Sequence, residues 1–259
     1  QSYICEKSGA VVKIMKPKIT IVIPCYNAEK WISESINSAL SQTYTNKEII
    51  FVDNESSDNS LEIAKEIQTK NQELMVFTAP NLYRYSWEEP VNEALSHATG
   101  DYFTILGADD FIADDYIENI AGIISAAPDR IKVFQSPILG VQGDREKYLG
   151  EISHQYKNLQ EFKTSLFKKC PVTTPSVVYK KELYDKGIIR WKSKEYLGSV
   201  DYELYFNIAD NGIFIYPYPK WIGYYYRWHD GQATWGMHKE VVNYDQVIRN
   251  YWREKWKQG

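Results

Sequence analysis

The chain has 259 residues, of which 30 are Lys or Arg and 34 are Asp or Glu, giving a net charge of −4. This mildly acidic balance gives the chain as a whole no electrostatic reason to bind nucleic acid, and no apolar run approaches the ~20 residues of a membrane-spanning helix. Hydrophobic residues make up 44% and charged residues 25%, which excludes a disordered or fibrous protein. The length predicts one large globular domain, or one domain with an appendage.

From residue 18 to residue 106, short apolar segments alternate with amphipathic ones. The expected strands are Ile19–Ile23, Glu48–Val52, Leu74–Phe77 and Tyr102–Leu106, and the expected helices are 31–40, 58–67 and Glu88–Ala98. This alternation is typical of βαβ units on a parallel sheet, whose ligands bind beyond the carboxyl ends of the strands. We therefore expect functional residues directly after Ile23, Val52 and Leu106.

The second half of the chain is less regular. We expect helices from the Asp114–Asp115 cap to just before Pro128, over Leu159–Phe167 and over Val200–Ala209, strands at Ile131–Gln135, Pro175–Tyr179, Ile213–Tyr216 and Ile222–Arg227, and loops through Gly140, Gly143 and Gly150. Helical spacing resumes from Lys239. We interpret the chain as an extension over 1–17, two halves over 18–110 and 111–238 that share one site, and a terminal helix over 239–259.

Cysteine usage and aromatic content give further expectations. Cys5, Cys25 and Cys170 form no CxxC pair, which argues against a disulfide framework or a zinc knuckle and is compatible with a cytoplasmic location. Aromatic residues make up 15% of the chain, and six of the eight Trp follow residue 190. This concentration requires an explanation in the core or in the function.

Polar residues follow three of the expected strands, in the segments Pro24–Ala28, Asp53–Asp58 and Gly107–Asp110. A carboxylate at a strand end can accept a hydrogen bond from a nucleobase, and paired carboxylates suit a divalent cation held partly by substrate phosphates. Taken on its own, each of these acidic residues is better explained by a turn or helix-cap role. Their shared position on one sheet edge favours a binding site.

Several segments in a fixed order resemble family 2 glycosyltransferases with the GT-A fold. They are Ile19–Ala28 (ITIVIPCYNA), Ser38–Thr43 (SALSQT), Glu48–Asp53 (EIIFVD), Asn92–Asp101 (NEALSHATGD), Gly107–Asp110 (GADD), Val200–Leu204 (VDYEL) and Tyr226–His229 (YRWH). The resemblance covers roughly residues 18–235. It implies a Rossmann-like α/β fold with a mixed, mostly parallel central sheet flanked by helices.

The resemblance implies that residues 18–110 bind a nucleoside-diphosphate sugar, with a UDP-sugar as the first expectation. Pro24, Tyr26 and Asn27 would line the base pocket, and Asp53 would accept a hydrogen bond from the nucleobase. Asp109 matches the last Asp of the family's DxD motif, which binds Mn²⁺ or Mg²⁺ between the two phosphates.

The same resemblance assigns a late His, His229, to the metal or diphosphate site, with Arg227 nearby. Asp110 belongs to the nucleotide-sugar site as well. Adjacent side chains of an extended segment point to opposite sides, so Asp110 should not duplicate Asp109. A cation at this position would stabilise the negative charge of the leaving diphosphate.

Asp201 matches the general base of inverting family members, which places the saccharide or lipid-linked saccharide acceptor on residues 111–238. The acceptor hydroxyl is a poor nucleophile, and a positioned carboxylate that takes its proton is typically worth ~10²–10⁴-fold in rate. A single carboxylate acting only as base fits inversion of the anomeric centre, whereas retention by double displacement requires a nucleophile. Alone, Asp201 could equally be a helix cap.

Four positions depart from the family pattern. Gly107 replaces the first Asp of DxD, Val91 stands where Arg is frequent, Glu55 where Gly is frequent, and Val200 where an acidic residue is frequent. These departures keep open a catalytically degenerate sugar- or nucleotide-binding module. A sugar nucleotidyltransferase is a weaker alternative, because no Gly-rich loop follows the first strand.

The C-terminal aromatic residues suggest an acceptor surface, since sugar rings stack on Trp and Tyr. Core packing is the competing explanation. The candidates for such a surface are Trp191, Trp221, Trp228 and Trp235. The terminal helix carries basic residues beside Trp252 and Trp256, which raises the hypothesis that it contacts the inner face of a membrane. Ordinary solvation or docking to a neighbouring element is the competing interpretation.

Overall fold

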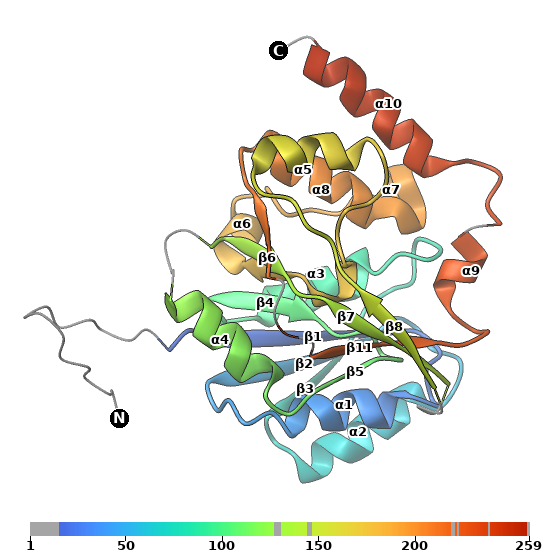
Figure 1. Ribbon diagram of the computed structural model, residues 1–259. Helices are drawn as coiled ribbons and strands as arrows, with labels where there is room; N and C mark the ends of the chain where they lie inside the picture. The colour runs from blue at the N-terminus through green and yellow to red at the C-terminus, as the bar shows by residue number, and fades with distance from the viewer. Residues whose placement is uncertain are drawn as a thin grey trace, which may run out of the picture.

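The computed structural model describes residues 16–126, 131–143, 147–218, 221, 223–237 and 239–257 (Figure 1). Some predicted features therefore lie outside the described residues. They are residues 1–15 of the expected extension with Cys5, Pro128, Ile222 and the last two positions of the terminal helix. Within the described part, no helix has the length and apolar character that a membrane span requires.

The larger of two sheets has seven strands. They are β1 Ile19–Cys25, β2 Lys47–Asp53, β3 Leu74–Thr78, β4 Tyr102–Ile105, β6 Val133–Gln135, β9 Val178–Lys180 and β10 Ile215–Pro217. Their order is β10-β6-β9-β4-β1-β2-β3, with β9 antiparallel to both neighbours and the other pairs parallel. The predicted mixed, mostly parallel sheet is confirmed, and strands from both halves of the chain build it.

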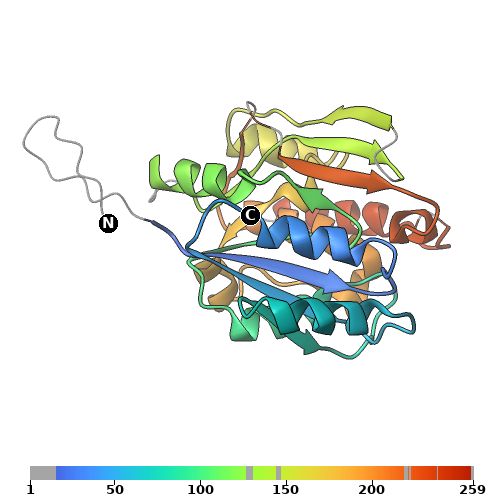
Figure 2. The same cartoon turned by 90° about the horizontal axis from the view of Figure 1, so that it is seen from below.

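Helices cover both faces of this sheet (Figure 1). α1 Ile32–Leu40, α2 Ser60–Lys70 and α4 Tyr116–Ala126 pack on one face, and α3 Glu88–His97, α5 Leu159–Leu166 and α8 Val200–Asp210 on the other. Because successive side chains of a strand point to opposite faces, Ile21 and Ile23 of β1 join the first core and Val22 joins the second. Figure 2 shows α1 and α2 next to each other, seen from below.

The smaller sheet has the order β5-β11-β7-β8. Its strands are β5 Phe111–Ile112, β7 Ile138–Gln142, β8 Lys147–Ile152 and β11 Tyr224–Trp228. The prediction of loops through Gly140 and Gly150 was wrong, because these residues pair across the β7–β8 hairpin. β8 could not be predicted from the sequence. Most of its residues are exposed, so the strand lacks the alternation of apolar and polar residues that marks a half-buried strand.

Shorter elements complete the second half. They are η1 Thr174–Ser176, α6 Lys181–Asp185, α7 Ser193–Tyr196, η2 Leu197–Ser199 and α9 Ala233–Met237. The strand predicted at Pro175–Tyr179 was wrong in its first part, because Pro175 lies in the 3₁₀ turn η1 and the strand starts at Val178. Proline fixes its own φ and has no N–H for a strand partner, which favours the turn.

The terminal helix α10 Tyr244–Lys257 docks on the protein through its apolar face. Ile248 and Trp252 are fully buried, and Trp252 stacks on Phe206 of α8 with ring centroids 5.8 Å apart. Asp210, at the end of α8, accepts hydrogen bonds from Lys255 Nζ at 2.7 Å and Trp256 Nε1 at 2.8 Å. The apolar face of α10 is therefore not available to lie on a lipid surface.

A buried carboxylate fastens the amino-terminal ends of the central strands. Glu48 Oε1 accepts hydrogen bonds from Thr20 Oγ1 at 2.6 Å and from the backbone N–H groups of Thr99 and Gly100 at 2.7 and 2.9 Å. Its Oε2 pairs with Lys18 Nζ at 2.6 Å. Burial opposes ionisation, but these bonds outweigh it and lower the pKa of Glu48 to about 2.

Replacing this carboxylate should destabilise the fold. We expect Glu48→Gln to lower the free energy of unfolding at pH 7 by about 2 kcal/mol, a value discounted for partial solvent screening. Because the folded pKa lies below the unfolded one, this contribution is full above about pH 4.5 and is lost as the pH falls toward 2. Urea denaturation measures it, with the exposed Glu66→Gln as control; equal losses in both variants would contradict the assignment.

Candidate active site

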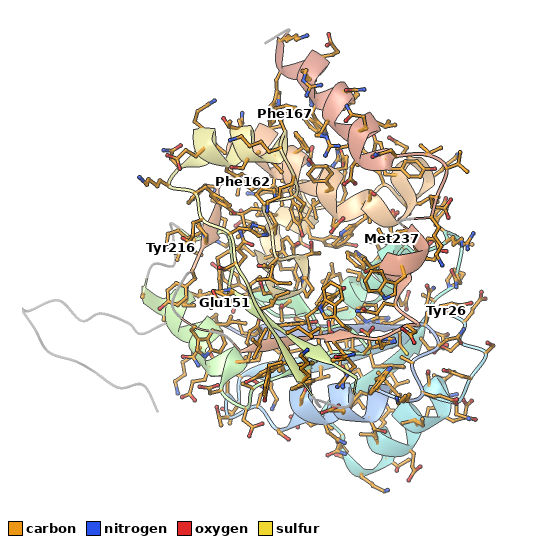
Figure 3. All side chains as sticks on the ribbon, turned by 45° about the vertical axis from the view of Figure 1, so that its right-hand side comes forward. Tyr26, Glu151, Phe162, Phe167, Tyr216 and Met237 are labelled. Atoms are coloured by element: carbon orange, nitrogen blue, oxygen red, sulfur yellow. The ribbon has the colours of Figure 1, made fainter. Side chains whose placement is uncertain are left out.

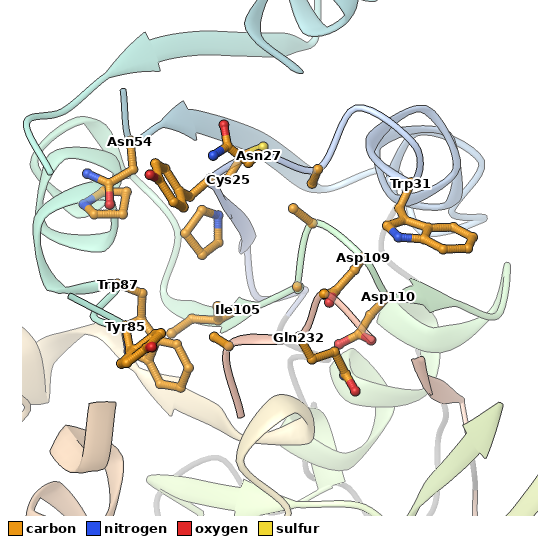
Figure 4. Close-up of a pocket in the computed structure, with 18 of the residues that line it drawn as sticks. Cys25, Asn27, Trp31, Asn54, Tyr85, Trp87, Ile105, Asp109, Asp110 and Gln232 are labelled. Atoms are coloured by element: carbon orange, nitrogen blue, oxygen red, sulfur yellow. The ribbon is translucent and has the colours of Figure 1, made fainter. Parts of the chain in front are cut away.

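The carboxyl ends of β1, β2 and β4 open onto a cavity of about 1080 Å³. Figure 4 shows Trp31, Asp109 and Asp110 on one side of it and Tyr85 and Trp87 on the other. Small-molecule sites usually enclose roughly 300–1,000 Å³. The cavity therefore has room for a nucleotide sugar together with part of a second ligand.

The loops after β1 and β2 are locked together by Asn27. Its backbone has a left-handed φ of +51°, and its Oδ1 accepts a hydrogen bond from the backbone N–H of Ser57 at 2.7 Å. Its own backbone N–H donates to Ser56 Oγ at 2.9 Å. Asn is one of the few residues with a side chain that adopt this backbone region readily. Asn27 thus fixes the wall on which Pro24 and Tyr26 lie, and Tyr26 is 56% exposed.

Asp53, the last residue of β2, is buried directly behind this wall. Its Oδ2 accepts a hydrogen bond from the backbone N–H of Ser56 at 2.9 Å. Its Oδ1 is buried and has no hydrogen-bond partner within the described residues. Asp53 does not itself line the cavity, but its sheet partner Cys25 and its chain neighbour Asn54 do. A buried acceptor without a donor is rare in folded proteins, so this oxygen has an unmet need for a donor.

The departure at Gly107 has a steric cause. A Cβ at this position would lie 2.6 Å from Asp110 Oδ2. Asp110 is buried, and it accepts hydrogen bonds from the Tyr224 hydroxyl at 2.7 Å and from the backbone N–H of Arg227 at 2.8 Å. Burial, reinforced by the neighbouring Asp109 carboxylate, raises the pKa of Asp110 well above its usual range. Asp110 therefore holds the turn to β11 and occupies the space that a first Asp of DxD would need.

Asp109 points the other way, toward His229. Its Oδ2 lies 2.9 Å from His229 Nε2. The backbone N–H of Gly231 donates a hydrogen bond to His229 Nδ1 at 3.2 Å, which holds the ring with Nε2 facing Asp109. Both side chains are partly exposed and line the cavity.

This pair fits two neighbouring ligands of one divalent cation. Ligands at right angles, each about 2.1 Å from a metal, are about 3 Å apart, close to the observed separation of the two atoms. Among the described residues, no group of three or more His, Cys, Asp or Glu could hold a metal. Further ligands would have to be phosphate oxygens and water, which is how Mg²⁺ commonly binds at phosphate sites.

Arg227 is fully buried and does not line the cavity. Its Nε donates to the backbone carbonyl of Asp109 at 2.6 Å, and its terminal nitrogens donate to Glu34 Oε2 and the carbonyl of Gly143. The guanidinium lies over the Trp31 ring, 4.3 Å from its centroid. Arg227 therefore positions Asp109 from behind, and each of its three guanidinium nitrogens donates to a protein group.

Asp201 lies in the first turn of α8, behind the opposite wall. Its Oδ2 accepts a hydrogen bond from Thr174 Oγ1 at 2.8 Å, and its Oδ1 accepts one from the backbone N–H of Tyr202 at 2.7 Å. Burial raises the pKa of Asp201 to about 6 and outweighs these two bonds. Thr174 lines the cavity and Asp201 does not, so the hydroxyl connects the carboxylate with the cavity.

The other departures also have physical reasons. Val91 and Val200 are buried in the core, away from the cavity wall. Glu55 adopts a left-handed φ of +58°, which explains why glycine is frequent there, and its Oε2 accepts a hydrogen bond from the backbone N–H of Asn81.

Of the four proposed acceptor-side tryptophans, Trp191 alone lines the cavity. Trp221 stacks on Tyr116, with centroids 5.0 Å apart, and Trp228 packs on Trp235 at 5.4 Å. Sequence reasoning missed Trp87, which lines the cavity together with Tyr85. The Nε1 of Trp87 is buried and has no hydrogen-bond partner within the described residues. No motif marks Trp87, because it stands in the irregular segment before α3.

The role of Arg227 can be tested through stability. Lysine keeps the charge but cannot reproduce the planar set of donors, so Arg227→Lys leaves buried acceptors without partners. We expect it to lower the free energy of unfolding by about 3 kcal/mol. Guanidinium denaturation measures the loss, and Arg84→Lys, at a side chain that is 72% exposed, is the matched control with an expected change of less than ~0.5 kcal/mol. Similar small changes in both variants would show that the buried contacts do not matter.

Known proteins resemble this chain in sequence and in fold. The family model described as "Glycosyl transferase family 2" matches residues 20–187. An uncharacterized glycosyltransferase of Haemophilus influenzae is 40% identical over 102 residues, which are 39% of this chain and 40% of the relative. The aligned segment thus covers less than half of either protein.

Another relative is aligned over most of both chains. The Escherichia coli UDP-Glc:alpha-D-GlcNAc-diphosphoundecaprenol beta-1,3-glucosyltransferase WfaP is 27% identical over 237 residues, 90% of this chain and 86% of the relative.

Solved structures share the fold. The Staphylococcus aureus TarS structure in complex with UDP-GlcNAc has a TM-score of 0.69 at 21% identity and covers 87% of this chain and 62% of that one. The mannosyltransferase PcManGT of Pyrobaculum calidifontis, in complex with GDP-Man and Mn²⁺, has a TM-score of 0.59 at 19% identity, over 85% and 60% of the two chains. Since the family model matches more than half of the residues, the chain belongs to glycosyl transferase family 2.

Proposed function

We propose that this chain is an inverting glycosyltransferase that moves a sugar from a UDP-sugar to a hydroxyl of a saccharide or lipid-linked saccharide. The observation that carries the proposal is the Asp109–His229 pair, 2.9 Å apart on the wall of a large cavity at the carboxyl ends of the strands. These two residues would hold Mn²⁺ or Mg²⁺. The cation would stabilise the charge that develops on the leaving diphosphate.

The surroundings of Asp53 support uracil as the base. Uracil presents one imide N–H between two carbonyls, whereas guanine presents two neighbouring N–H donors to a carboxylate. Asp53 Oδ2 is already engaged by the backbone N–H of Ser56, and only Oδ1 is without a donor. One available acceptor matches one donor. Tyr26, 56% exposed on the adjacent loop, would stack on the ring.

Asp201 would act as the general base with Thr174 as its link to the acceptor. The acceptor hydroxyl loses its proton as its oxygen attacks the anomeric carbon, and the C–O bond to the diphosphate breaks. The proton would pass to Asp201 directly, or through Thr174, which gives its own proton to the carboxylate as it receives one. Direct displacement of this kind inverts the anomeric configuration.

The acceptor sugar would stack between the aromatic side chains of the inner wall. Tyr85, Trp87 and Trp191 line the cavity, as do Thr174 and Tyr179. The unpartnered Nε1 of Trp87 offers a hydrogen-bond donor for a sugar hydroxyl. An aromatic wall is the kind of surface that fits the apolar face of a pyranose.

A donor screen tests the function. The protein is incubated with Mn²⁺ and a panel of UDP- and GDP-sugars, and release of the nucleoside diphosphate is measured. We expect UDP-sugars to be turned over in preference to GDP-sugars. Asp109→Ala should lose at least about 100-fold in kcat/KM because a cation ligand is gone. Asp201→Asn should lose about 10²–10⁴-fold in transfer to an acceptor.

Two outcomes would reject the proposal. Turnover that is independent of any metal would exclude the role of Asp109 and His229. Binding of UDP without turnover of any donor, in a protein with full affinity for Mn²⁺, would favour the degenerate binding module instead.

The pKa of Asp201 predicts the pH dependence. A general base works only when it is ionised, so kcat/KM should rise with pH through an apparent pKa of about 6 at saturating Mn²⁺. Thr174→Val removes a hydrogen bond that stabilises the ionised carboxylate. It should therefore shift the rise of kcat/KM to higher pH and lower the value that kcat/KM reaches at high pH. Thr174→Ser, which keeps the hydroxyl, should restore the wild-type profile. A profile that is the same in all three proteins would contradict the role of Asp201.

A further inference from the structure

Exposed apolar side chains are frequent in two segments of the chain that meet next to the cavity. Ten large hydrophobic side chains are exposed in the described part of the chain. Five of them lie in the loop before α3 and in the segment 241–251, and we call these five the apolar rim: Leu82, Val241, Val242, Val247 and Tyr251, which are 64%, 99%, 47%, 45% and 48% exposed. Scattered exposed hydrophobic residues are normal, whereas a group of them usually marks a contact surface.

The rim adjoins the cavity through two contacts between its segments. Arg84 lines the cavity and pairs with Glu240, the residue before Val241, at 3.6 Å. Gly236 of α9 lies so close to Tyr85 that a Cβ would be 2.3 Å from the Tyr85 hydroxyl oxygen. Figure 1 shows the loop before α3 beside α9, and Figure 3 shows Met237 of α9 and Tyr26 on the same side of the molecule.

The remaining members of the rim continue from this junction onto α10. The backbone N–H of Tyr244 donates to the carbonyl of Val242 at 3.1 Å, so the rim turns directly into the helix. Val247 and Tyr251 are four residues apart and therefore share one face of α10. This face is different from the one that docks Ile248 and Trp252 on α8.

The charged side chains near the rim indicate which kind of ligand it could bind. Arg84, 72% exposed, stands between the cavity and Leu82, and its guanidinium also lies 4.6 Å from the Tyr85 ring centroid. On α10, Lys255 pairs with Asp210 and Lys257 with Glu254. A phosphate that displaces Glu240 from Arg84 would bind a cation next to an apolar surface at the mouth of the cavity. This order of groups matches an amphiphile with a saccharide, a phosphate and a hydrocarbon chain.

We propose that the apolar rim binds the hydrocarbon chain of a lipid-linked acceptor while Arg84 contacts its phosphate. This inference rests on the proposed function, because the cavity must hold the saccharide of the same acceptor. It commits the acceptor to the lipid-linked class. It also gives the exposed valines of the 241–247 segment a partner.

The test uses farnesyl phosphate as a short prenyl phosphate and inorganic phosphate as the headgroup alone, with binding measured by calorimetry on the full chain. We expect farnesyl phosphate to bind at least about tenfold more tightly than phosphate. The double variant Val241→Ser/Val242→Ser should lose about tenfold of this affinity because two apolar side chains are removed from the contact. Arg84→Gln should weaken both ligands.

A matched control is available on β8 of the smaller sheet. Tyr148 and Leu149 of β8 are 63% and 44% exposed, and Tyr148→Ser/Leu149→Ser should leave farnesyl phosphate binding unchanged. Equal affinity for farnesyl phosphate and phosphate, or equal losses in both double variants, would overturn the proposal. So would cosedimentation with phosphatidylcholine vesicles free of prenyl phosphate that the rim variant abolishes, since the rim would then bind a bilayer.

Failure of this inference is distinguishable from failure of the proposed function. The binding measurement contains no nucleotide sugar, and the donor screen contains no lipid. If the protein turns over UDP-sugars but binds farnesyl phosphate and phosphate equally well, the proposed function stands and the lipid-binding role of the rim is rejected. If it binds farnesyl phosphate more tightly but turns over no nucleotide sugar, the lipid-binding role stands and the proposed function is rejected.

Discussion

The buried guanidinium of Arg227 is the interaction on which the geometry of the site depends. An arginine without solvent contact is tolerated only when its donors are all satisfied, and the partners here come from three separate parts of the chain: Glu34 on α1, the carbonyl of Asp109 and the carbonyl of Gly143. The hydrogen bonds of this one side chain thus hold the smaller sheet, which carries Arg227, against α1 and the turn after β4. His229, two residues beyond Arg227, is carried to Asp109 by the same constraint. The separation of the two candidate metal ligands is therefore set by a residue that touches neither the cavity nor its ligand.

Asp109 and Asp110, adjacent in the 107–110 turn, have the same side chain but different roles because they differ in burial. Asp110 faces inward, where burial disfavours its charged form and Tyr224 and the backbone of Arg227 occupy its oxygens. Asp109 faces the cavity and retains an oxygen at the distance from His229 that a shared cation requires. Gly107 belongs to the same arrangement, because the Asp110 carboxylate fills the space of a side chain there. The missing first Asp is thus compatible with an intact site that relies on Asp109 alone.

The first half of the fold was predictable from sequence because its strands are buried and apolar and its helices are amphipathic, so both periodicities are strong. The β7–β8 hairpin was not, since β8 is exposed and carries no alternation. Among candidate site residues, those directly after strands could be placed on one edge without coordinates. Glu34 could not, because its partner Arg227 is 193 residues away and no local pattern connects them. The role of Thr174 could not be predicted either, because a strand was expected where the 3₁₀ turn η1 places Thr174 against Asp201.

The aromatic excess, unexplained by sequence alone, also bears on the chemistry of the base. Some of it is core, as with Trp252 on Phe206. Another part surrounds Asp201, where Tyr179 and Tyr205 are themselves buried and have raised pKa values. Dense aromatic packing removes water from the carboxylate, and this desolvation raises its pKa toward neutrality. A carboxylate with such a pKa is a stronger base than an exposed one and is still ionised at pH 7. The residues that pack the second half therefore raise the basicity of the carboxylate that we propose takes the acceptor's proton.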